Sequence, residues 1–530
     1  MNFQSLLGQH VAANPTRVAF YDQKRRWTYQ ALSEEVDRIA RVLHQHNARQ
    51  GDRLAIWMPN CIQWLVVFLA CARLGITVVA VNTRFREQEV GQLLERGECR
   101  WLAVWPEFKG LPFAEILAAI SPQVLRELRG VLGVGELRGL REYMPDLPLV
   151  SYETIPALDD LDRVASAPDT AGALVYTTSG TTSAPKLVLH RQAGLIEHGK
   201  TVAAAYKIDH DSTVLLAAPL CGAFGFSTAV SGLAAGSALV SSPVFHAADT
   251  VRQILEYQVT HTFANNEFID LLLKEVEGQE QPFPSLEYVG FASFAPSMDD
   301  LPERARDKGV PIAGLYGSSE LQALVAGHRL DTPWKDRRVA GGTLASPEGR
   351  VRAVSLEGGA TLPHGEVGLI EVKVPSIMSE YLDNPEATAK AVSGDGYFRT
   401  GDLGLTLTDR EFVFHGRNGD YLRLGGFLVN PLEIEGFIER IDGVRACQVV
   451  GTEFHGRLVP VAFVISEFGC EVSETSIIEK CRSSLARFKV PQRVATVDAF
   501  PVVQSANSNK IQRARLVQMA ATLVACDLDT

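Results

Sequence analysis

Apolar and polar positions in the first half of the chain follow two patterns in turn. Arg53–Met58 and Thr77–Val81 are short apolar runs typical of buried strands, whereas Cys61–Leu74 and Glu87–Arg96 have the length and spacing of helices. Runs of the same two kinds recur between residues 213 and 257. This alternation predicts an α/β architecture of layered subdomains around largely parallel sheets.

The pattern changes twice farther along. Residues 340–415 contain many glycines and short alternating runs such as Gly368–Val374, which predicts antiparallel strands in a small β-barrel-like subdomain. After residues 416–420 the chain restarts, with Pro431–Ile441 expected as a helix and Ala446–Val450 and Val459–Ile465 as strands. The sequence therefore predicts a large N-terminal domain over residues 1–416 and a small α+β C-terminal domain over residues 421–530.

Charge supports the same boundary. The chain of 530 residues carries 51 basic and 62 acidic side chains, yet residues 421–530 contain 12 of each, so the whole acidic excess lies before them. This excess argues against a general nucleic-acid-binding protein, because neutralising phosphates requires basic residues. The 46% of hydrophobic residues is that of a globular protein with a large core.

Two apolar stretches, Trp64–Val81 and Ser227–Phe245, resemble membrane spans in length. The first contains Arg73 and the second is rich in Gly, Ser and Ala, so we interpret each as a buried helix leading into a buried strand. The N-terminus has no signal-peptide pattern and the eight cysteines form no C-x-x-C pair. We therefore expect a cytoplasmic protein with no membrane segment.

The most informative motif is the run Tyr-Thr-Thr-Ser-Gly-Thr-Thr-Ser-Ala-Pro-Lys at residues 176–186. Hydroxyl groups, a glycine and a lysine in one loop are suited to surround phosphate oxygens with donors and one positive charge. The loop lies between two expected strands, Gly172–Tyr176 and Leu187–Leu189, and it lacks the Walker spacing. A polar surface hairpin is the alternative interpretation of this segment alone.

Three further motifs follow in order: Gly-Leu-Tyr-Gly-Ser-Ser-Glu at 314–320, Gly-Tyr-Phe-Arg-Thr-Gly-Asp-Leu-Gly at 396–404 and Gly-Arg-Asn-Gly-Asp at 416–420. Together with the hydroxyl-rich loop and Lys510, they make the chain similar to the adenylate-forming superfamily of AMP-forming acyl-CoA synthetases, luciferases and adenylation domains. The similarity covers nearly the whole chain, from residue 14 to Arg513.

The resemblance implies where ATP binds. The phosphates would be held by the loop, Tyr316 would stack on adenine beside the small Gly317, and Asp402 would accept both ribose hydroxyls, with Arg417 nearby. Glu320 and Thr182 would hold Mg²⁺, since this hard cation prefers carboxylate and hydroxyl oxygens together with phosphates. The full set of implied nucleotide-binding residues is Thr178, Ser179, Gly180, Thr181, Thr182, Ser183, Lys186, Ala295, Pro296, Tyr316, Gly317, Ser319, Asp402 and Arg417.

The resemblance also implies a mechanism in two half-reactions. Lys510 would bridge the carboxylate and the α-phosphate, with Glu320 as the second catalytic residue. The C-terminal domain would then rotate about a hinge at 417–420, centred on Asp420, and bring the Gly425–Gly426 loop to the thiol channel. CoA is the expected thiol, because residues 480–515 are strongly basic and suit a phosphate-rich acceptor; a solvated basic face is the alternative interpretation of this segment. A carrier-protein phosphopantetheine acceptor and a non-catalytic nucleotide-binding relative are the two alternatives.

Three departures from the family pattern concern the phosphate loop, the turn before Lys510 and the acyl pocket. Ser183 stands where a glycine is usual, and Asn509 replaces the glycine before Lys510. The expected acyl pocket consists of Phe224, Asn266, Phe294 and Gly317, with Phe294 in place of a small residue. These residues disfavour a long-chain fatty acid. Asn265 or Asn266 is alternatively the N-cap of a helix over Phe268–Glu275, with Glu267 in its first turn.

Overall fold

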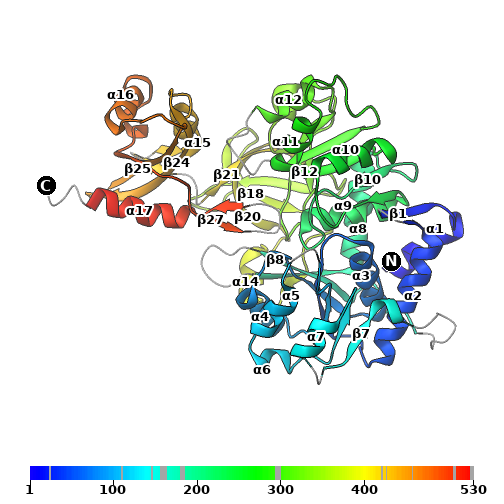
Figure 1. Ribbon diagram of the computed structural model, residues 1–530. Helices are drawn as coiled ribbons and strands as arrows, with labels where there is room; N and C mark the ends of the chain where they lie inside the picture. The colour runs from blue at the N-terminus through cyan, green and yellow to red at the C-terminus, as the bar shows by residue number, and fades with distance from the viewer. Residues whose placement is uncertain are drawn as a thin grey trace. The chain divides into compact units, whose positions relative to one another are not determined.

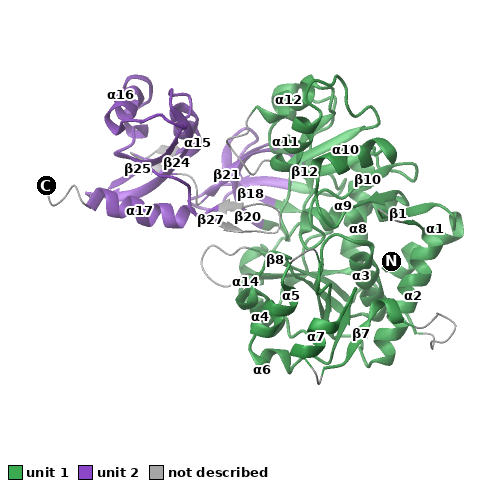
Figure 2. Cartoon of the chain, in the orientation of Figure 1, with its two compact units in different colours: residues 1–293, 300–350, 372–398 green, residues 294–299, 351–371, 399–530 purple. Residues whose placement is uncertain are grey.

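The computed structural model describes residues 1–22, 25–108, 111–144, 147–155, 164–178, 186–292, 300–418, 422–424, 427–455, 457–504 and 509–525. The chain divides into two compact units (Figure 2). Unit 1 comprises residues 1–293, 300–350 and 372–398, and unit 2 comprises residues 294–299, 351–371 and 399–530. The observed mixed α/β fold, with a large N-terminal part and a smaller C-terminal part, confirms the predicted fold class.

Unit 1 contains a first sheet of eight strands in the order β19-β9-β8-β4-β3-β5-β6-β7. Neighbours from β8 to β7 are parallel, whereas β9 pairs with β8 and with β19 in antiparallel fashion. The strands are β3 (Arg53–Trp57), β4 (Thr77–Ala80), β5 (Trp101–Val104), β6 (Gly130–Gly133), β7 (Leu149–Ser151), β8 (Gly172–Thr178), β9 (Lys186–Arg191) and β19 (Glu380–Tyr381).

A second set of strands in unit 1 has the order β16-β15-β14-β13-β12-β10-β11-β1-β2. The central strands from β14 to β1 are parallel, and β2, β15 and β16 are antiparallel to their neighbours. The strands are β1 (Val18–Asp22), β2 (Arg25–Thr28), β10 (Thr213–Leu215), β11 (Ala238–Val240), β12 (His261–Asn265), β13 (Tyr288–Ala292), β14 (Ile312–Tyr316), β15 (Ala326–Gly327) and β16 (Gly341–Leu344).

Helices lie against both sheets and between them (Figure 1). They are α1 (Phe3–Ala13), α2 (Tyr29–Gln45), α3 (Ile62–Leu74), α4 (Glu87–Arg96), α5 (Phe113–Ala119), α6 (Pro122–Leu125), α7 (Arg138–Tyr143), α8 (Gln192–Tyr206), α9 (Ala223–Ala235), α10 (Ala247–Glu256), α11 (Asn266–Glu275), α12 (Leu301–Asp307), α13 (Trp334–Arg337) and α14 (Pro385–Ala391).

Helices α3 and α9 form the middle of unit 1. Helix α3 contacts β3, β4 and β8 of the first sheet, and α9 contacts β10, β11 and β12 of the second. The two helices meet where the rings of Phe68 and Phe226 pack edge to face, 4.6 Å apart. Both helices are apolar on all sides, as burial between two sheets requires. These helices and the strands after them confirm that Trp64–Val81 and Ser227–Phe245 are helix–strand units of the core.

Glycines end both central helices. Gly75 after α3 and Gly236 after α9 have φ angles of 73° and 76°, in the left-handed region that glycine adopts without a side-chain clash. Each turn sends the chain directly into the following buried strand. The described part of the chain contains no helix with the length and apolar character needed to cross a bilayer.

Unit 2 begins with antiparallel strands and ends in a separate small core. Its strands β17, β18, β20 and β21 follow in this order, and β20 and β21 are antiparallel, in agreement with the pattern predicted for residues 340–415. The elements are β17 (Arg350–Val354), β18 (Val367–Lys373), β20 (Phe398–Thr408), β21 (Glu411–Arg417), β22 (Leu422–Leu424), β23 (Phe427–Val429), α15 (Pro431–Ile438), β24 (Val444–Phe454), β25 (Arg457–Ser466), α16 (Glu474–Ser484), β26 (Arg493–Thr496), β27 (Val502–Gln504), β28 (Asn509–Ile511) and α17 (Arg513–Ala525).

A buried ion pair connects helix α17 to the rest of the C-terminal core. The Arg513 guanidinium lies 3.0 Å from a Glu435 oxygen and donates to the Val449 carbonyl at 2.6 Å. The Val449 amide donates to the same carboxylate at 2.8 Å. Burial raises the pKa of Glu435, and Arg513 opposes this effect. The pair therefore fixes the start of α17, two residues after β28, against α15 and β24.

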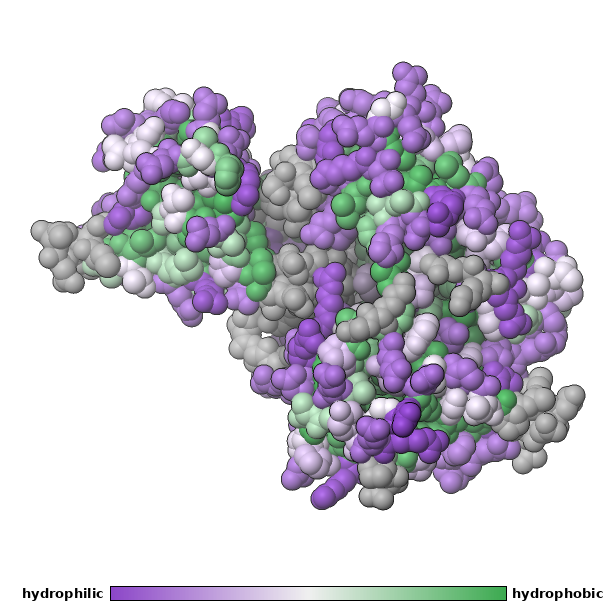
Figure 3. Space-filling view, in the orientation of Figure 1, coloured by the Kyte–Doolittle hydropathy of each residue, from purple (hydrophilic) through white to green (hydrophobic). Residues whose placement is uncertain are grey.

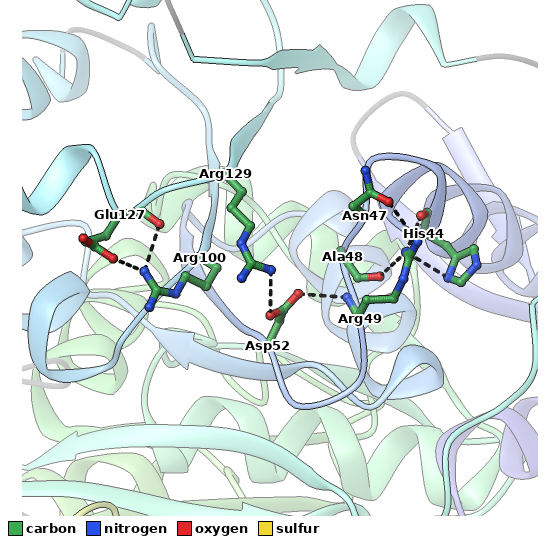
Figure 4. A network of polar contacts seen from close by, with 8 residues as sticks. All are labelled: His44, Asn47, Ala48, Arg49, Asp52, Arg100, Glu127 and Arg129. Atoms are coloured by element: carbon green, nitrogen blue, oxygen red, sulfur yellow. Dashed lines mark hydrogen bonds and ion pairs between the residues drawn. The ribbon is translucent and has the colours of Figure 1, made fainter.

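Polar side chains tie together the amino ends of the parallel strands in the first sheet (Figure 4). Arg129, just before β6, pairs with Asp52, just before β3, at 3.3 Å, and Asp52 also accepts the Arg49 amide at 2.9 Å. Arg100 before β5 pairs with Glu127. Ligands of parallel sheets bind at the carboxyl ends of strands, so this network stabilises the opposite edge.

Outside these networks, hydrophilic side chains cover most of the visible face of unit 1 in Figure 3. Of the seven cysteines in the described part of the chain, six are buried and Cys470 is exposed; none forms a disulfide. The six buried cysteines therefore belong to the core of the described chain.

Candidate active site

Two of the predicted site segments lie at one edge of the second sheet. Strands β12, β13 and β14 are adjacent and parallel, so their carboxyl ends, at Asn265, Ala292 and Tyr316, lie at the same edge. Asn266 and Tyr316 are 50 positions apart in the sequence, but the sheet brings their strand ends together. This is the edge at which open parallel sheets bind ligands.

Gly317 is the first residue after β14, and its lack of a side chain has a packing reason. A Cβ atom at this position would lie 2.4 Å from the Cα atom of Ala323, closer than any real contact. Gly317 itself is exposed and Tyr316 before it is buried, whereas Ser319 and Glu320 are partly exposed. The glycine therefore allows the chain to fold back on itself directly behind the segment that we predict to bind the nucleotide.

The chain folds back through a strained turn. Gln322, Ala323 and Leu324 have φ angles of 64°, 53° and 45°, all in the left-handed region. Each non-glycine residue in this region costs about 1–2 kcal/mol. All three residues are buried, so solvent cannot satisfy the backbone of this turn. The surrounding side chains must hold it.

Two buried histidines donate to carbonyl oxygens of this segment. His190 Nε2 lies 2.8 Å from the Ser319 oxygen, and His198 Nε2 lies 2.9 Å from the Ala323 oxygen. Burial lowers the pKa of each histidine to about 4, so both rings are neutral at neutral pH. His190, four residues after Lys186, thus has a hydrogen-bonding role, and His198 is a residue that the sequence did not single out.

Glu320 has a partner that the sequence also did not indicate. The Tyr381 hydroxyl donates to Glu320 Oε1 at 2.9 Å, and the Lys186 ammonium lies 4.5 Å from the centre of the Tyr381 ring. Strand β19 carries Tyr381 and pairs with β9, which begins at Lys186. The Glu320 carboxylate has further acceptor sites besides this bond, so it can serve as a protein ligand of a phosphate-bound Mg²⁺.

Replacing Tyr381 with phenylalanine should raise the Mg²⁺ concentration needed for half-maximal activity by roughly 10–150-fold, because a hydrogen bond to a charged group contributes about 1.5–3 kcal/mol. Titrating Mg²⁺ at saturating ATP measures this effect. Tyr397→Phe is the matched control, since Tyr397 lies near Lys373 rather than Glu320. An unchanged Mg²⁺ profile for Tyr381→Phe would separate this hydroxyl from metal binding.

Asp402 and Arg417 face each other in unit 2. They are direct partners in the register of β20 and β21, and Arg417 Nε lies 3.0 Å from Asp402 Oδ1. Arg417 also donates to the Thr400 carbonyl at 2.8 Å. The Asp402 side chain is 5% exposed and that of Arg417 is 57% exposed. The structure thus brings together the two residues predicted to contact the ribose, through a register that the sequence did not reveal.

Of the three acyl-pocket residues in the described part of the chain, Phe224 and Asn266 are buried, whereas Gly317 is exposed. Phe224 lies in the first turn of α9. Asn266 begins α11, and the preceding Asn265 caps this helix by accepting the Phe268 amide at 3.0 Å. The cap, with Glu267 in the first turn, confirms the capping interpretation of this segment. Contact of Phe224 or Asn266 with the acid stays a prediction.

Several predicted site residues lie outside the described part of the chain. They are Ser179, Gly180, Thr181, Thr182, Ser183, Phe294, Ala295, Pro296, Asp420, Gly425 and Gly426. Thr178 and Lys186, at the two ends of the phosphate loop, are cross-strand partners in β8 and β9. The backbone of Lys510 belongs to β28 and pairs with Val503 in β27.

Comparisons with known proteins agree with this architecture. Residues 7–382 match the family model of the AMP-binding enzymes, and residues 433–507 match the model of the AMP-binding enzyme C-terminal domain. The chain is 30% identical over 497 residues to the methyl-dioxo-octahydro-indenyl-propanoyl:CoA ligase of Rhodococcus jostii, covering 91% of this chain and 92% of that protein. It is 28% identical over 502 residues to 2-succinylbenzoate–CoA ligase of Geobacillus kaustophilus, covering 93% and 94%.

A solved structure has the same fold. ATP-bound MatB from Rhodopseudomonas palustris superposes with a TM-score of 0.81 at 22% identity, covering 99% of this chain and 100% of that chain. The chain therefore belongs to the AMP-binding enzyme family, as the motifs predicted. It is an AMP-forming acid–CoA ligase, with ATP and CoA as its co-substrates.

Proposed function

We propose that this ligase activates a compact carboxylic acid in an ATP- and Mg²⁺-dependent reaction and transfers the acyl group to CoA. The carboxylate attacks the α-phosphate of ATP, which forms the acyl-adenylate and releases pyrophosphate. The CoA thiol then attacks the acyl carbon, forms the thioester bond and releases AMP. Lys510, as a compact cation, offsets the repulsion between the carboxylate and the α-phosphate in the first step.

The proposal of a compact acid is supported by the close contact between α8, α9 and the turn after β14. A Cβ atom on Gly199 in α8 would lie 2.7 Å from Val230 Cγ1 and 2.8 Å from the Val230 oxygen in α9. One turn earlier in α9, the Ser227 hydroxyl donates to the Gln322 carbonyl. The contact of Gly199 with Val230 therefore leaves no space for an alkyl chain between the two helices at this level, and the Ser227 hydroxyl makes their junction with the turn polar.

The roles of the remaining site residues follow from the chemistry of their side chains. Glu320 is the carboxylate ligand of Mg²⁺, which would be shared with ATP phosphates and would supply charge neutralisation there. Tyr316 stacks on adenine. Asp402 accepts hydrogen bonds from the ribose hydroxyls, and Arg417 orients the Asp402 carboxylate. Between the two half-reactions, residues 421–530 rotate about a hinge at 417–420, and the segment of Gly425 and Gly426 then lines the thiol channel.

A panel of acids tests the proposal directly. ATP–pyrophosphate exchange would be measured with short straight-chain, branched, aryl and long-chain acids, followed by CoA-dependent release of AMP for the best acid. We expect the highest specificity constants among the compact acids. A preference that rises with chain length would contradict the closed junction of α8 and α9, and exchange without CoA-dependent turnover would contradict CoA as the acceptor.

Asp402→Ala should raise the Michaelis constant for ATP by roughly 10–100-fold and leave kcat less affected, because a ribose contact is made in both the ground and transition states. Initial rates at varied ATP and saturating acid provide the measurement. Asp409→Ala, an exposed aspartate in the turn after β20, is the control. An unchanged Michaelis constant for ATP in Asp402→Ala would exclude the carboxylate from nucleotide binding.

A further inference from the structure

The left-handed turn at Gln322–Leu324 connects the predicted nucleotide-binding segment to strand β15. Three consecutive non-glycine residues with positive φ rarely persist unless their surroundings determine the conformation. The turn also closes through a hydrogen bond of 2.7 Å from the Ala323 amide to the Ser318 carbonyl. Its shape therefore depends on contacts from outside the segment and sets the path of residues 317–320.

Three buried side chains supply these contacts, and we call them the turn clamp: His198 of α8, Ser227 of α9 and Gln322 itself. His198 donates to the Ala323 carbonyl at 2.9 Å, and the Ser227 hydroxyl donates to the Gln322 carbonyl. The Gln322 amide donates to the carbonyl oxygens of Ser376 at 2.6 Å and Gly194 at 3.2 Å. All three clamp residues are at most 2% exposed.

The His198 ring uses both of its nitrogen atoms. A carbonyl oxygen only accepts hydrogen bonds, so the proton resides on Nε2 facing Ala323, and Nδ1 accepts from the Ser376 hydroxyl at 3.2 Å. Burial lowers the pKa of His198 to about 4, which keeps the ring neutral in this tautomer. The ring is thus a fixed donor between α8 and the strained turn.

Movement of the turn would be passed to the site through direct contacts. Gly317 packs against the Cα atom of Ala323 with no space for even a Cβ atom. The Glu320 carbonyl accepts the Met378 amide at 2.8 Å, three residues before Tyr381, which holds the Glu320 carboxylate. A displaced Ala323 would therefore shift both Gly317 and the carboxylate predicted to bind Mg²⁺.

We propose that the turn clamp positions Tyr316, Gly317 and Glu320 for acyl-adenylate formation, with His198 as its central positioning residue. The inference rests on the proposed roles of these three residues in binding ATP and Mg²⁺. The clamp residues themselves touch neither substrate nor metal in this proposal. They act by holding a strained backbone in the one conformation that places the nucleotide-binding segment correctly.

Pyrophosphate exchange with the best acid of the panel tests the clamp in four variants. His198→Leu removes the donor and should lower kcat by about 10–100-fold, as small displacements of catalytic groups do. Ala323→Gly removes the conformational strain, and adding it to His198→Leu should restore kcat to within about fivefold of wild type.

His261→Leu is the matched control, because His261 is equally buried and donates to the Tyr206 carbonyl, away from the turn. Ser227→Ala removes one hydroxyl and should lower kcat by about 3–10-fold.

The double variant separates positioning from simple loss of stability. Because glycine at a positive-φ position also stabilises the fold, the free energy of unfolding of each variant is measured beside kcat. Positioning by His198 predicts that His261→Leu loses as much unfolding free energy as His198→Leu while its kcat stays near that of wild type. Equal loss of kcat in His198→Leu and His261→Leu, or absence of rescue, would overturn the proposal. If His198→Leu does not fold, normal kcat in folded Ser227→Ala overturns it instead. Failure of the metal assignment is distinguishable, because Glu320→Gln would then keep the wild-type Mg²⁺ dependence.

Discussion

Replacing Lys510 with alanine is expected to slow acyl-adenylate formation by about 10²–10³-fold, the effect of removing one preorganised charge-assisted contact from a transition state. The reason is electrostatic: the attacking carboxylate and the α-phosphate are both anions, and the ammonium stabilises them as they meet. Thioester formation from supplied acyl-adenylate should change much less, since that step joins a thiol to an acyl carbon.

Single-turnover measurements of the two half-reactions provide the test of this prediction. Lys390→Ala is a suitable control, because Lys390 is an exposed residue of α14. Its ammonium pairs with the exposed Glu386 carboxylate at 2.7 Å. It should stay within about twofold of wild type in both half-reactions, since exposed ion pairs contribute little. Equal losses for Lys510→Ala in both half-reactions would favour a structural role of the lysine.

Replacing Arg513 with methionine is expected to destabilise the C-terminal core by about 3–5 kcal/mol, because the change leaves the buried Glu435 carboxylate without its cation. The Glu435 side chain is 2% exposed and bonds the Val449 amide, so it cannot turn toward solvent without breaking the contact between α15 and β24. Hydrogen–deuterium exchange of peptides from α15, β24 and α17 would measure the loss locally.

A second substitution makes this prediction specific. Glu435→Gln in the Arg513→Met background removes the uncompensated charge and should recover most of the lost protection, since a neutral amide costs less to bury. Protection equal to wild type in Arg513→Met alone would mean that the ion pair contributes nothing to the core. If the loss of exchange protection persists in the double variant, the effect comes from the packing of the arginine side chain rather than from its charge.

The order of helices and strands could be predicted because it depends on local pattern. The runs at residues 53–58, 61–74 and 87–96 correspond to β3, α3 and α4, and the Asn265 cap follows from short-range spacing. Element ends were less accurate. Strand β24 extends to Phe454 rather than to Val450, because hairpin pairing with β25 continues through the polar Thr452 and Glu453.

The contacts that build the site could not be predicted in the same way. The Tyr381–Glu320 bond joins residues 61 positions apart, and His198 contacts Ala323 across 125 positions. The pairing of Asp402 with Arg417 depends on the register of two strands that shifts twice along their length. A single sequence gives residue types but no register, so it named Glu320, Asp402 and Arg417 without indicating that Tyr381 holds Glu320 or that Asp402 and Arg417 are cross-strand partners.

The burial of the cysteines has a consequence for an enzyme that produces activated acyl groups. An acyl-adenylate reacts with any accessible thiolate, so the chain risks acylating itself. Burial raises the pKa of Cys61, Cys99 and Cys221 to about 12 and that of Cys481 to about 11, which keeps these thiols protonated and unreactive. Among the described cysteines only Cys470 is exposed. Acylation of cysteine thiols in the described chain should therefore be confined to one position, and the CoA thiol meets little competition from these thiols for the activated acyl group.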